Sequence, residues 1–204
     1  MNLSNKITVM RIIISVAIII ILLFPLDASG MSLPKLFINE SIVVDLKYIL
    51  SGLLFIIVSL IDYLNGHIAR KKNLVTNFGK MLDAIADKIL VNSVLVILSA
   101  NGFISPIIPV VIIIRDSVVN SIRIYMGNKS KVVTTIKSGK VKSACLTTGI
   151  VLTLFYNLPF ELWNLKVSDA LLIVAAVLSV VSAMQYYYIT QELLINEKKE
   201  ILEN

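Results

Sequence analysis

Four polar residues in the first half of the chain have the types and the spacing to hold divalent cations. Asp62 and Asn65 are three residues apart, and Asp83 and Asp87 are four residues apart. On an α-helix each pair lies on one face, so two helix ends could direct oxygen ligands to one point. Carboxylates this close repel one another unless a hard cation such as Mg²⁺ neutralises them. Because paired cations are typical of phosphoryl displacement, the spacing predicts a metal–phosphate site.

Small residues and one arginine surround these four positions. Gly66 and Ala69 follow the first ligand pair, and Gly79 lies one helical turn before the second pair. Side chains this small leave room for a bulky ligand or for close approach of another helix. Arg70 comes next along the chain and can pair with a phosphate group. We therefore expect a ligand that carries phosphate to share the site with the cations.

The composition places these residues in a membrane protein. Of the 204 residues, 57% are hydrophobic and 16% are charged, whereas about 25% of the residues in soluble domains are charged. Disordered tails lack so much apolar surface. The only cysteine is Cys145, which excludes a disulfide scaffold. We predict an all-α fold in which residues 1–204 form a single integral-membrane domain.

Six apolar runs are each near the ~20 residues that a helix needs to cross about 30 Å of hydrocarbon. Helices satisfy their own backbone groups, which lipid cannot do. The predicted spans are about 7–24, 47–64, 82–100, 105–126, 143–158 and 167–189. A cleaved signal peptide in place of the first span is less favoured, because it would leave five spans and break the charge pattern described next.

The basic residues predict how the spans are oriented. The segments after the second and fourth spans are basic and contain no acid between their first and last basic residues. These basic residues are Arg70, Lys71, Lys72 and Lys80 in the first segment, and Lys129, Lys131, Lys137, Lys140 and Lys142 in the second. Since basic residues gather on the cytoplasmic side, both segments and both termini are predicted to be cytoplasmic. The same rule explains the net charge of +6 without a nucleic-acid partner.

The four ligand positions and their neighbours together resemble the signature of the CDP-alcohol phosphatidyltransferases, D-x2-D-G-x2-A-R-x8-G-x3-D-x3-D. Residues 62–87 read DYLNGHIARKKNLVTNFGKMLDAIAD and match every fixed position except the second, which is Asn65. The resemblance covers nearly the whole chain. It is greatest to the bacterial phosphatidylglycerophosphate synthases, through NKITVMR, NLVTNFGKMLDAIADKIL and IIIRDSVVNSIR followed by SGKVKS.

The resemblance implies a reaction in phospholipid biosynthesis at the cell membrane. The phosphatidyl group of CDP-diacylglycerol would pass to the hydroxyl of sn-glycerol 3-phosphate, and CMP would leave. Transfer to another acceptor alcohol is the alternative within the family. The resemblance also implies a homodimer, and two divalent cations that are either Mg²⁺ or Mn²⁺.

Roles for individual residues follow from the same resemblance. The implied metal ligands are Asp62, Asn65, Asp83 and Asp87. Asp87 is in addition the implied general base for the attacking hydroxyl. The residues that would shape the CDP pocket are Gly66, Ala69, Arg70 and Gly79.

The phosphate of such an acceptor is negatively charged, so a binding site for it needs basic residues. Arg115 and Arg123 are eight residues apart, near two helical turns, so they lie close to one stripe of the fourth span. Two arginines within the membrane are costly unless they meet an anion. The predicted acceptor-binding residues are Arg115, Arg123, Lys140 and Lys142. Two roles stay open for Asp116, namely pairing with a neighbouring basic side chain or ordering the site.

Asn65 is the one departure from the family signature. An amide oxygen can ligate a hard cation, but it brings no negative charge. We therefore expect one cation to bind more weakly, or a single cation to replace the pair. Three interpretations stay open: an active enzyme with altered metal affinity, an impaired relative with a lipid-binding or scaffold role, and a change introduced to trap a complex. The intact Asp62, Asp83 and Asp87 favour an enzyme.

Overall fold

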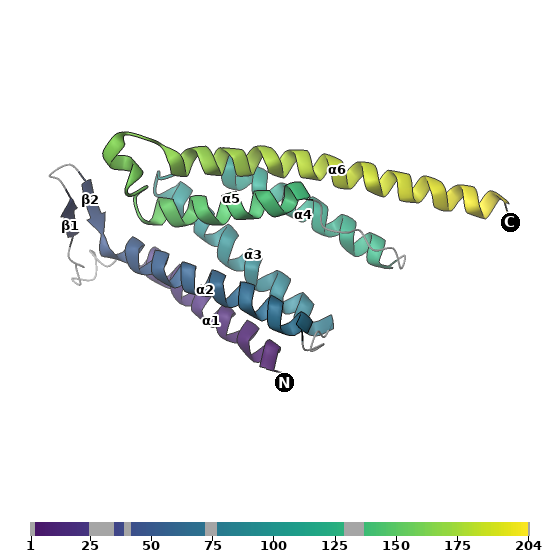
Figure 1. The fold of residues 1–204 in the computed structure, drawn as a ribbon, viewed down its shortest axis with the longest axis horizontal. Helices are drawn as coiled ribbons and strands as arrows, with labels where there is room; N and C mark the ends of the chain where they lie inside the picture. Colours follow the sequence, from purple (N-terminus) through teal and green to yellow (C-terminus); the bar gives the residue numbers. More distant parts are fainter. Residues whose placement is uncertain (1–2, 25–34, 39–41, 72–76, 129–136, 204) are drawn as a thin grey trace. The chain divides into compact units, whose positions relative to one another are not determined.

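The structure, a computed structural model, describes residues 3–24, 35–38, 42–71, 77–128 and 137–203 (Figure 1). Side chains are described for residues 6–24, 43–64, 79, 82–83, 85–127 and 137–195. Within these ranges the fold consists of helices and one two-stranded hairpin. The elements are α1 (Leu3–Leu23), β1 (Lys35–Ile38), β2 (Ile42–Asp45), α2 (Leu46–Lys71), α3 (Asn77–Ala100), α4 (Ile107–Asn128), α5 (Lys137–Leu154), the 3-10 helix η2 (Phe160–Trp163) and α6 (Val167–Glu203).

The helices lie where the apolar runs predicted them, and the all-α expectation is confirmed. Their ends differ from the predicted spans, because α2 continues to Lys71 and α6 continues to Glu203. The fifth span, predicted at 143–158, is a helix from Lys137 that ends at Leu154. Lysine, arginine and glutamate are good helix formers, so a helix can extend past its apolar section. The antiparallel hairpin, which pairs Lys35 with Asp45 and Ile38 with Ile42, was not predicted from the sequence.

Three of the described helices are long and apolar enough to cross a membrane. The qualifying segments are Lys6–Leu23 in α1, Leu46–Leu64 in α2 and Val167–Ile195 in α6. In contrast, every 18-residue stretch of α3, α4 or α5 contains at least three charged residues. Their apolar character is interrupted by the residues from which the sequence predicts a site. The chain is therefore a helical membrane protein whose predicted site residues lie on α2, α3, α4 and α5.

The chain divides into two compact units. The first unit comprises Met1–Phe103 and Ile150–Val167, and the second comprises Ile104–Gly149 and Ser168–Asn204. Each unit has its own buried apolar side chains. Examples are Ile18, Phe55, Val58 and Leu95 in the first unit, and Ile112, Met126, Leu172 and Tyr186 in the second.

In the first unit α1 packs along both α2 and α3 (Figure 1). The hairpin leads directly into α2 and is held by an aromatic cluster. The rings of Tyr48, Phe103 and Tyr156 meet edge to face, with centroids 4.8 to 5.8 Å apart. The Tyr156 hydroxyl accepts a hydrogen bond of 3.1 Å from the main-chain N–H of Asp45. Contacts between residues far apart in sequence therefore fix the entry into α2.

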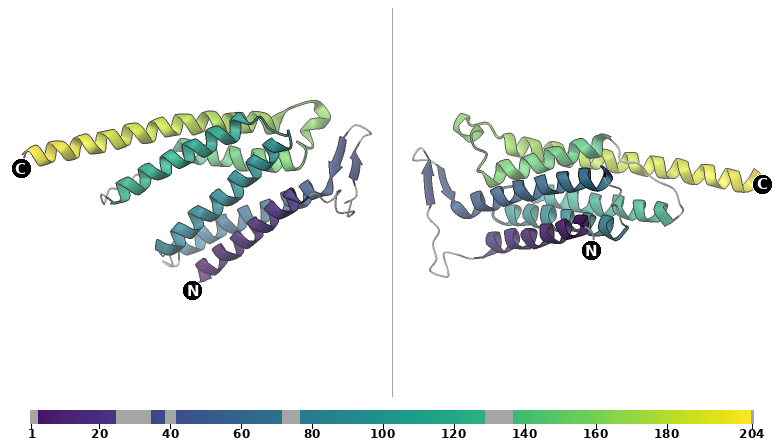
Figure 2. Two further views of the ribbon diagram at one scale, coloured as in Figure 1. Left: turned by 180° about the vertical axis from the view of Figure 1, so that it is seen from behind. Right: turned by 60° about the horizontal axis from the view of Figure 1, so that its bottom comes forward.

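In the second unit α4, α5 and α6 lie side by side, and α6 runs on past the other two (Figure 2). The approach of α5 to α6 depends on Gly149. A Cβ atom at this position would lie 2.8 Å from Leu172 Cδ2, closer than real contacts allow. The absence of a side chain at Gly149 thus lets the two helices meet closely enough to place polar side chains of α6 against α4 and α5.

Candidate active site

In the first unit, two motif aspartates from different helices meet at one guanidinium. Nη1 of Arg11 in α1 forms an ion pair with Asp62 of α2. Nη2 of Arg11 lies 3.3 Å from Oδ1 of Asp83 in α3, and it also donates a 2.8 Å hydrogen bond to the Asp83 main-chain oxygen. The structure therefore brings together one carboxylate from each of the two predicted ligand pairs.

The helix α1 forms the buried side of this carboxylate cluster. Thr8 lies one turn before Arg11, and its hydroxyl donates a 3.2 Å hydrogen bond to Oδ1 of Asp83. Thr8 and Arg11 are buried, whereas the side chains of Asp62 and Asp83 are 42% and 37% exposed. The carboxylates are thus anchored from one side and remain accessible on the other.

The remaining motif residues are described to different degrees. Asp87 lies one turn after Asp83 on α3 and is exposed, and Gly79 lies one turn before Asp83. Four further residues continue the backbone of α2, but their side chains lie outside the described residues. They are Asn65, Gly66, Ala69 and Arg70. Their predicted roles in metal and CDP binding therefore stay predictions.

The chemistry of the cluster fits a divalent cation, although the described residues do not form a complete coordination shell. No group of three His, Cys, Asp or Glu side chains within the described ranges is arranged to hold a metal ion. Asp62 and Asp83 nevertheless already converge on a positive group. Their carboxylate oxygens are the hard ligands that Mg²⁺ prefers. We conclude that these two aspartates have suitable donors and a suitable meeting point for such a cation.

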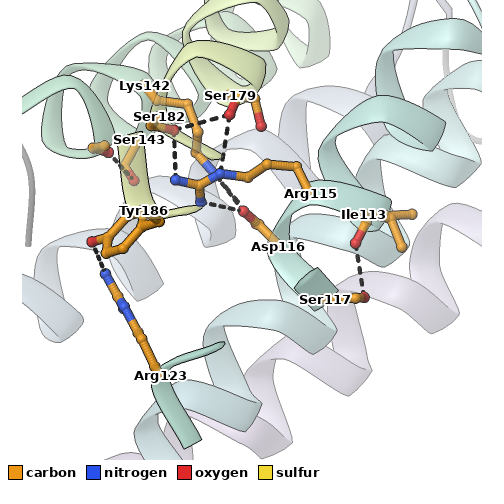
Figure 3. Close-up of polar contacts among 11 residues, drawn as sticks. Ile113, Arg115, Asp116, Ser117, Arg123, Lys142, Ser143, Ser179, Ser182 and Tyr186 are labelled. Carbon is orange, nitrogen blue, oxygen red and sulfur yellow. Dashed lines mark hydrogen bonds and ion pairs between the residues drawn. The ribbon is translucent and has the colours of Figure 1, made fainter. Parts of the chain in front are cut away.

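In the second unit, Asp116 of α4 joins two of the predicted basic residues (Figure 3). Nη1 of Arg115 donates to Oδ1 of Asp116 at 2.7 Å. Nζ of Lys142 lies 2.9 Å from Oδ1 and 3.2 Å from Oδ2 of the same carboxylate. Of the two roles left open for Asp116, the structure thus shows pairing, and with two basic side chains at once.

Arg115 is further held by α6. Its Nε donates to the main-chain oxygen of Ser179 at 3.2 Å, and its Nη2 donates to the Ser182 hydroxyl at 2.6 Å. All three guanidinium nitrogens of Arg115 therefore have an acceptor within the second unit. This explains how a charged side chain that is 11% exposed is tolerated in this helix bundle.

Arg123 meets a neutral partner instead of a carboxylate. Its Nη2 donates to the hydroxyl of the buried Tyr186. The guanidinium also lies 4.9 Å from the centroid of that ring, and the Arg115 guanidinium lies 5.8 Å from the same centroid. Both arginines thus reach one side chain of α6, which agrees with the predicted shared stripe on α4. Lys140 is exposed on α5.

Several residues of these clusters escaped the sequence argument. Arg11 and Thr8 lie outside the aspartate motif, and Tyr186 carries no charge. The available signal for Arg11 was its position inside an apolar helix, where an arginine needs an anion. Tyr186 gave no such signal, because a tyrosine in an apolar helix is most often a packing residue.

Comparison with known proteins assigns the chain to a family. Residues 1–185 match the model of the CDP-alcohol phosphatidyltransferase family. The CDP-diacylglycerol--glycerol-3-phosphate 3-phosphatidyltransferase of Bacillus subtilis is 38% identical over 186 residues, which cover 91% of this chain and 93% of that protein. The Mycoplasma genitalium protein of the same name is 35% identical over 82% of this chain and 68% of its own length.

A solved structure shares the fold. The crystal structure of phosphatidylinositol phosphate synthase from Mycobacterium tuberculosis, in apo form, superposes with a TM-score of 0.58 at 19% identity. The superposition covers 91% of this chain and 87% of that one. The aspartate signature, the helical fold and the family match agree, and the chain is an enzyme that belongs to the CDP-alcohol phosphatidyltransferase family.

Proposed function

We propose that this enzyme transfers the phosphatidyl group of CDP-diacylglycerol to sn-glycerol 3-phosphate, with release of CMP. The observation that carries the proposal is the meeting of Asp62 and Asp83, from separate helices, at one positive group. The acceptor is supported by the relatives named for this reaction, which the chain matches over most of its length. The product would be phosphatidylglycerophosphate, a precursor in phospholipid biosynthesis.

The carboxylate cluster would handle the donor. The metal ligands in this proposal are Asp62, Asn65, Asp83 and Asp87. A divalent cation held there, Mg²⁺ or Mn²⁺, would offset the negative charge of the pyrophosphate and of the CMP leaving group. The accessible side of Asp62 and Asp83 leaves room for the pyrophosphate. The residues proposed to shape the CDP pocket are Gly66, Ala69, Arg70 and Gly79.

Asp87 is proposed as the general base. It is exposed and lies one turn from Asp83 on the same helix face. A carboxylate within hydrogen-bond reach of the acceptor hydroxyl can take its proton as the new phosphate ester forms. Its exposure keeps it accessible to an acceptor from the aqueous phase.

The basic cluster of the second unit is proposed to bind the acceptor phosphate. Arg115, Arg123 and Lys142 contribute three positive charges, and Asp116 contributes one negative charge, so the sum of these four is +2. The largely buried members, Arg115, Lys142 and Asp116, retain an excess of +1, and the exposed Arg123 adds one more charge. An excess of positive charge in a partly buried site is stabilised by an anion, and glycerol 3-phosphate is close to a dianion at neutral pH. Lys140 is exposed on the same helix as Lys142 and would add to the attraction.

The proposal also includes the membrane arrangement. All six long described helices cross the cell membrane, the termini and both basic segments face the cytoplasm, and residues 1–204 act as one catalytic domain in a homodimer. The charge pattern supports the orientation, and the family match over residues 1–185 supports a single domain.

Product analysis with alternative acceptors tests the proposed reaction. The purified protein in lipid nanodiscs receives CDP-diacylglycerol, Mn²⁺ and one acceptor at a time, and lipid products are identified by mass spectrometry. We expect phosphatidylglycerophosphate from glycerol 3-phosphate and no product from serine, inositol or phosphatidylglycerol. Efficient transfer to one of the other acceptors would overturn the proposed acceptor while leaving the reaction class in place.

A further inference from the structure

Arg11 is integrated into the carboxylate cluster although it lies outside the aspartate signature. Its side chain is 3% exposed, and its terminal nitrogens contact Asp62 and Asp83. Within the described residues its Nε atom is buried and has no hydrogen-bond partner. A buried guanidinium is costly without an anion, so the two carboxylates are what makes this position favourable for Arg11.

The same two carboxylates are the proposed ligands of a divalent cation. The formal charges of the two carboxylates and the Arg11 guanidinium sum to −1. Without the guanidinium, the two carboxylates alone would carry a charge of −2. Charges of the same sign held within a few ångströms repel strongly where solvent is partly excluded. Asp62 and Asp83 would therefore separate without a cation, and a guanidinium and a divalent cation would compete for their oxygens.

We propose that Arg11 is a built-in counter-cation, a positioning residue that bridges Asp62 and Asp83 before metal binds and releases the Asp62 carboxylate when it does. The inference rests on the proposed function, which places a divalent cation at these aspartates. The hydrogen bond from Arg11 to the main-chain oxygen of Asp83 involves no carboxylate atom. That bond can persist through the exchange and keep Arg11 beside the site.

Removal of the Arg11 side chain distinguishes competition with the metal from a purely structural role, because the two predict opposite changes in metal affinity. If Arg11 only orients the ligands, its removal weakens metal binding. If Arg11 competes for them, its removal strengthens metal binding, because the cation no longer displaces a positive group. We expect Arg11→Gln to bind Mn²⁺ about tenfold more tightly than the wild type. The same variant should be less stable than the wild type without metal, and the stabilisation by Mn²⁺ should be larger.

Mn²⁺ binding to the full chain in nanodiscs, followed by electron paramagnetic resonance, measures this directly. Arg11→Lys retains the positive charge, so its Mn²⁺ affinity should lie within about threefold of that of the wild type. Lys6→Gln is the matched control, since it removes an exposed positive charge from the same helix without touching the carboxylates. Equal or weaker Mn²⁺ binding by Arg11→Gln would overturn the proposal.

A second measurement on the wild type covers the case in which Arg11→Gln does not fold. The chain contains four arginines, so their side-chain ¹⁵N signals can be assigned with Arg11→Lys. The Arg11 signal should shift on saturation with Mg²⁺, and an unchanged signal would overturn the proposal. Failure of the proposed function looks different, because the wild type itself would then neither bind Mn²⁺ nor release CMP.

Discussion

At the scale of single residues, Asp116 shows how one carboxylate organises a basic cluster. It pairs with both Arg115 and Lys142, which the sequence places 27 residues apart in two different helices. Without it, two basic side chains that are 11% and 6% exposed would face each other. Asp116 therefore sets the positions of these cations as well as part of the cluster's net charge.

Asp116→Asn should accordingly destabilise the protein by about 3 kcal/mol, because breaking a buried ion pair leaves uncompensated charge. Thermal unfolding in nanodiscs measures the loss. Glu192→Gln is the matched control, since Glu192 is exposed on α6 of the same unit and should leave stability within about 0.5 kcal/mol of the wild type. Equal stability of the two variants would show that the Asp116 pairs contribute nothing.

Asn65 leads to the second prediction at this scale. Asn65→Asp restores a fourth carboxylate to the signature and adds one negative charge beside the cations. We expect the Mn²⁺ concentration for half-maximal CMP release to fall about tenfold, with Asp45→Asn as a carboxylate control outside the signature. An unchanged metal requirement would mean that residue 65 does not contribute to metal binding.

At the scale of elements, close helix contacts decide where polar side chains end up. Gly149 lets α5 approach α6, and the Ser179 and Ser182 contacts to Arg115 come from that same α6. Overpacking at such a contact forces backbone or side-chain shifts. The geometry of the basic cluster is therefore sensitive to a helix contact that carries no charge.

Gly149→Ala should cost about 1–3 kcal/mol, because its Cβ would lie 2.8 Å from Leu172. Combining it with Leu172→Ala should cost less than the sum of the two single changes. Gly127→Ala is the matched control, because no atom lies within 4 Å of its Cβ on α4. Additive losses in the double variant would exclude Leu172 as the cause.

The helices could be predicted from the sequence because long apolar runs leave lipid-exposed chain no other regular structure. The hairpin could not be predicted, because its strands are only four residues each. One of the contacts that hold it is the hydrogen bond from Asp45 to Tyr156, which is 111 positions further along the chain. The aspartate motif was visible because its spacing is local to two helices. The contacts of Arg11 were not visible in the sequence, because they depend on the packing of α1 against α2 and α3.

At the scale of the whole molecule, the charge pattern predicts orientation. Cys145 is the only cysteine, so Cys145→Ser gives a background for single cysteines. Lys166→Cys should react with a membrane-impermeant maleimide added outside intact cells, and Glu200→Cys should react only after lysis. Labelling of position 200 from outside would contradict the proposed cytoplasmic C-terminus.

CMP release by the purified chain tests the account as a whole. With CDP-diacylglycerol, glycerol 3-phosphate and Mn²⁺, we predict CMP release that requires both substrates, stops on chelation of the metal and falls at least about 100-fold in Asp83→Asn. Glu192→Gln should keep the wild-type rate. No CMP from the wild type at any metal concentration, or release that survives both chelation and Asp83→Asn, would contradict metal-dependent phosphatidyl transfer at these carboxylates.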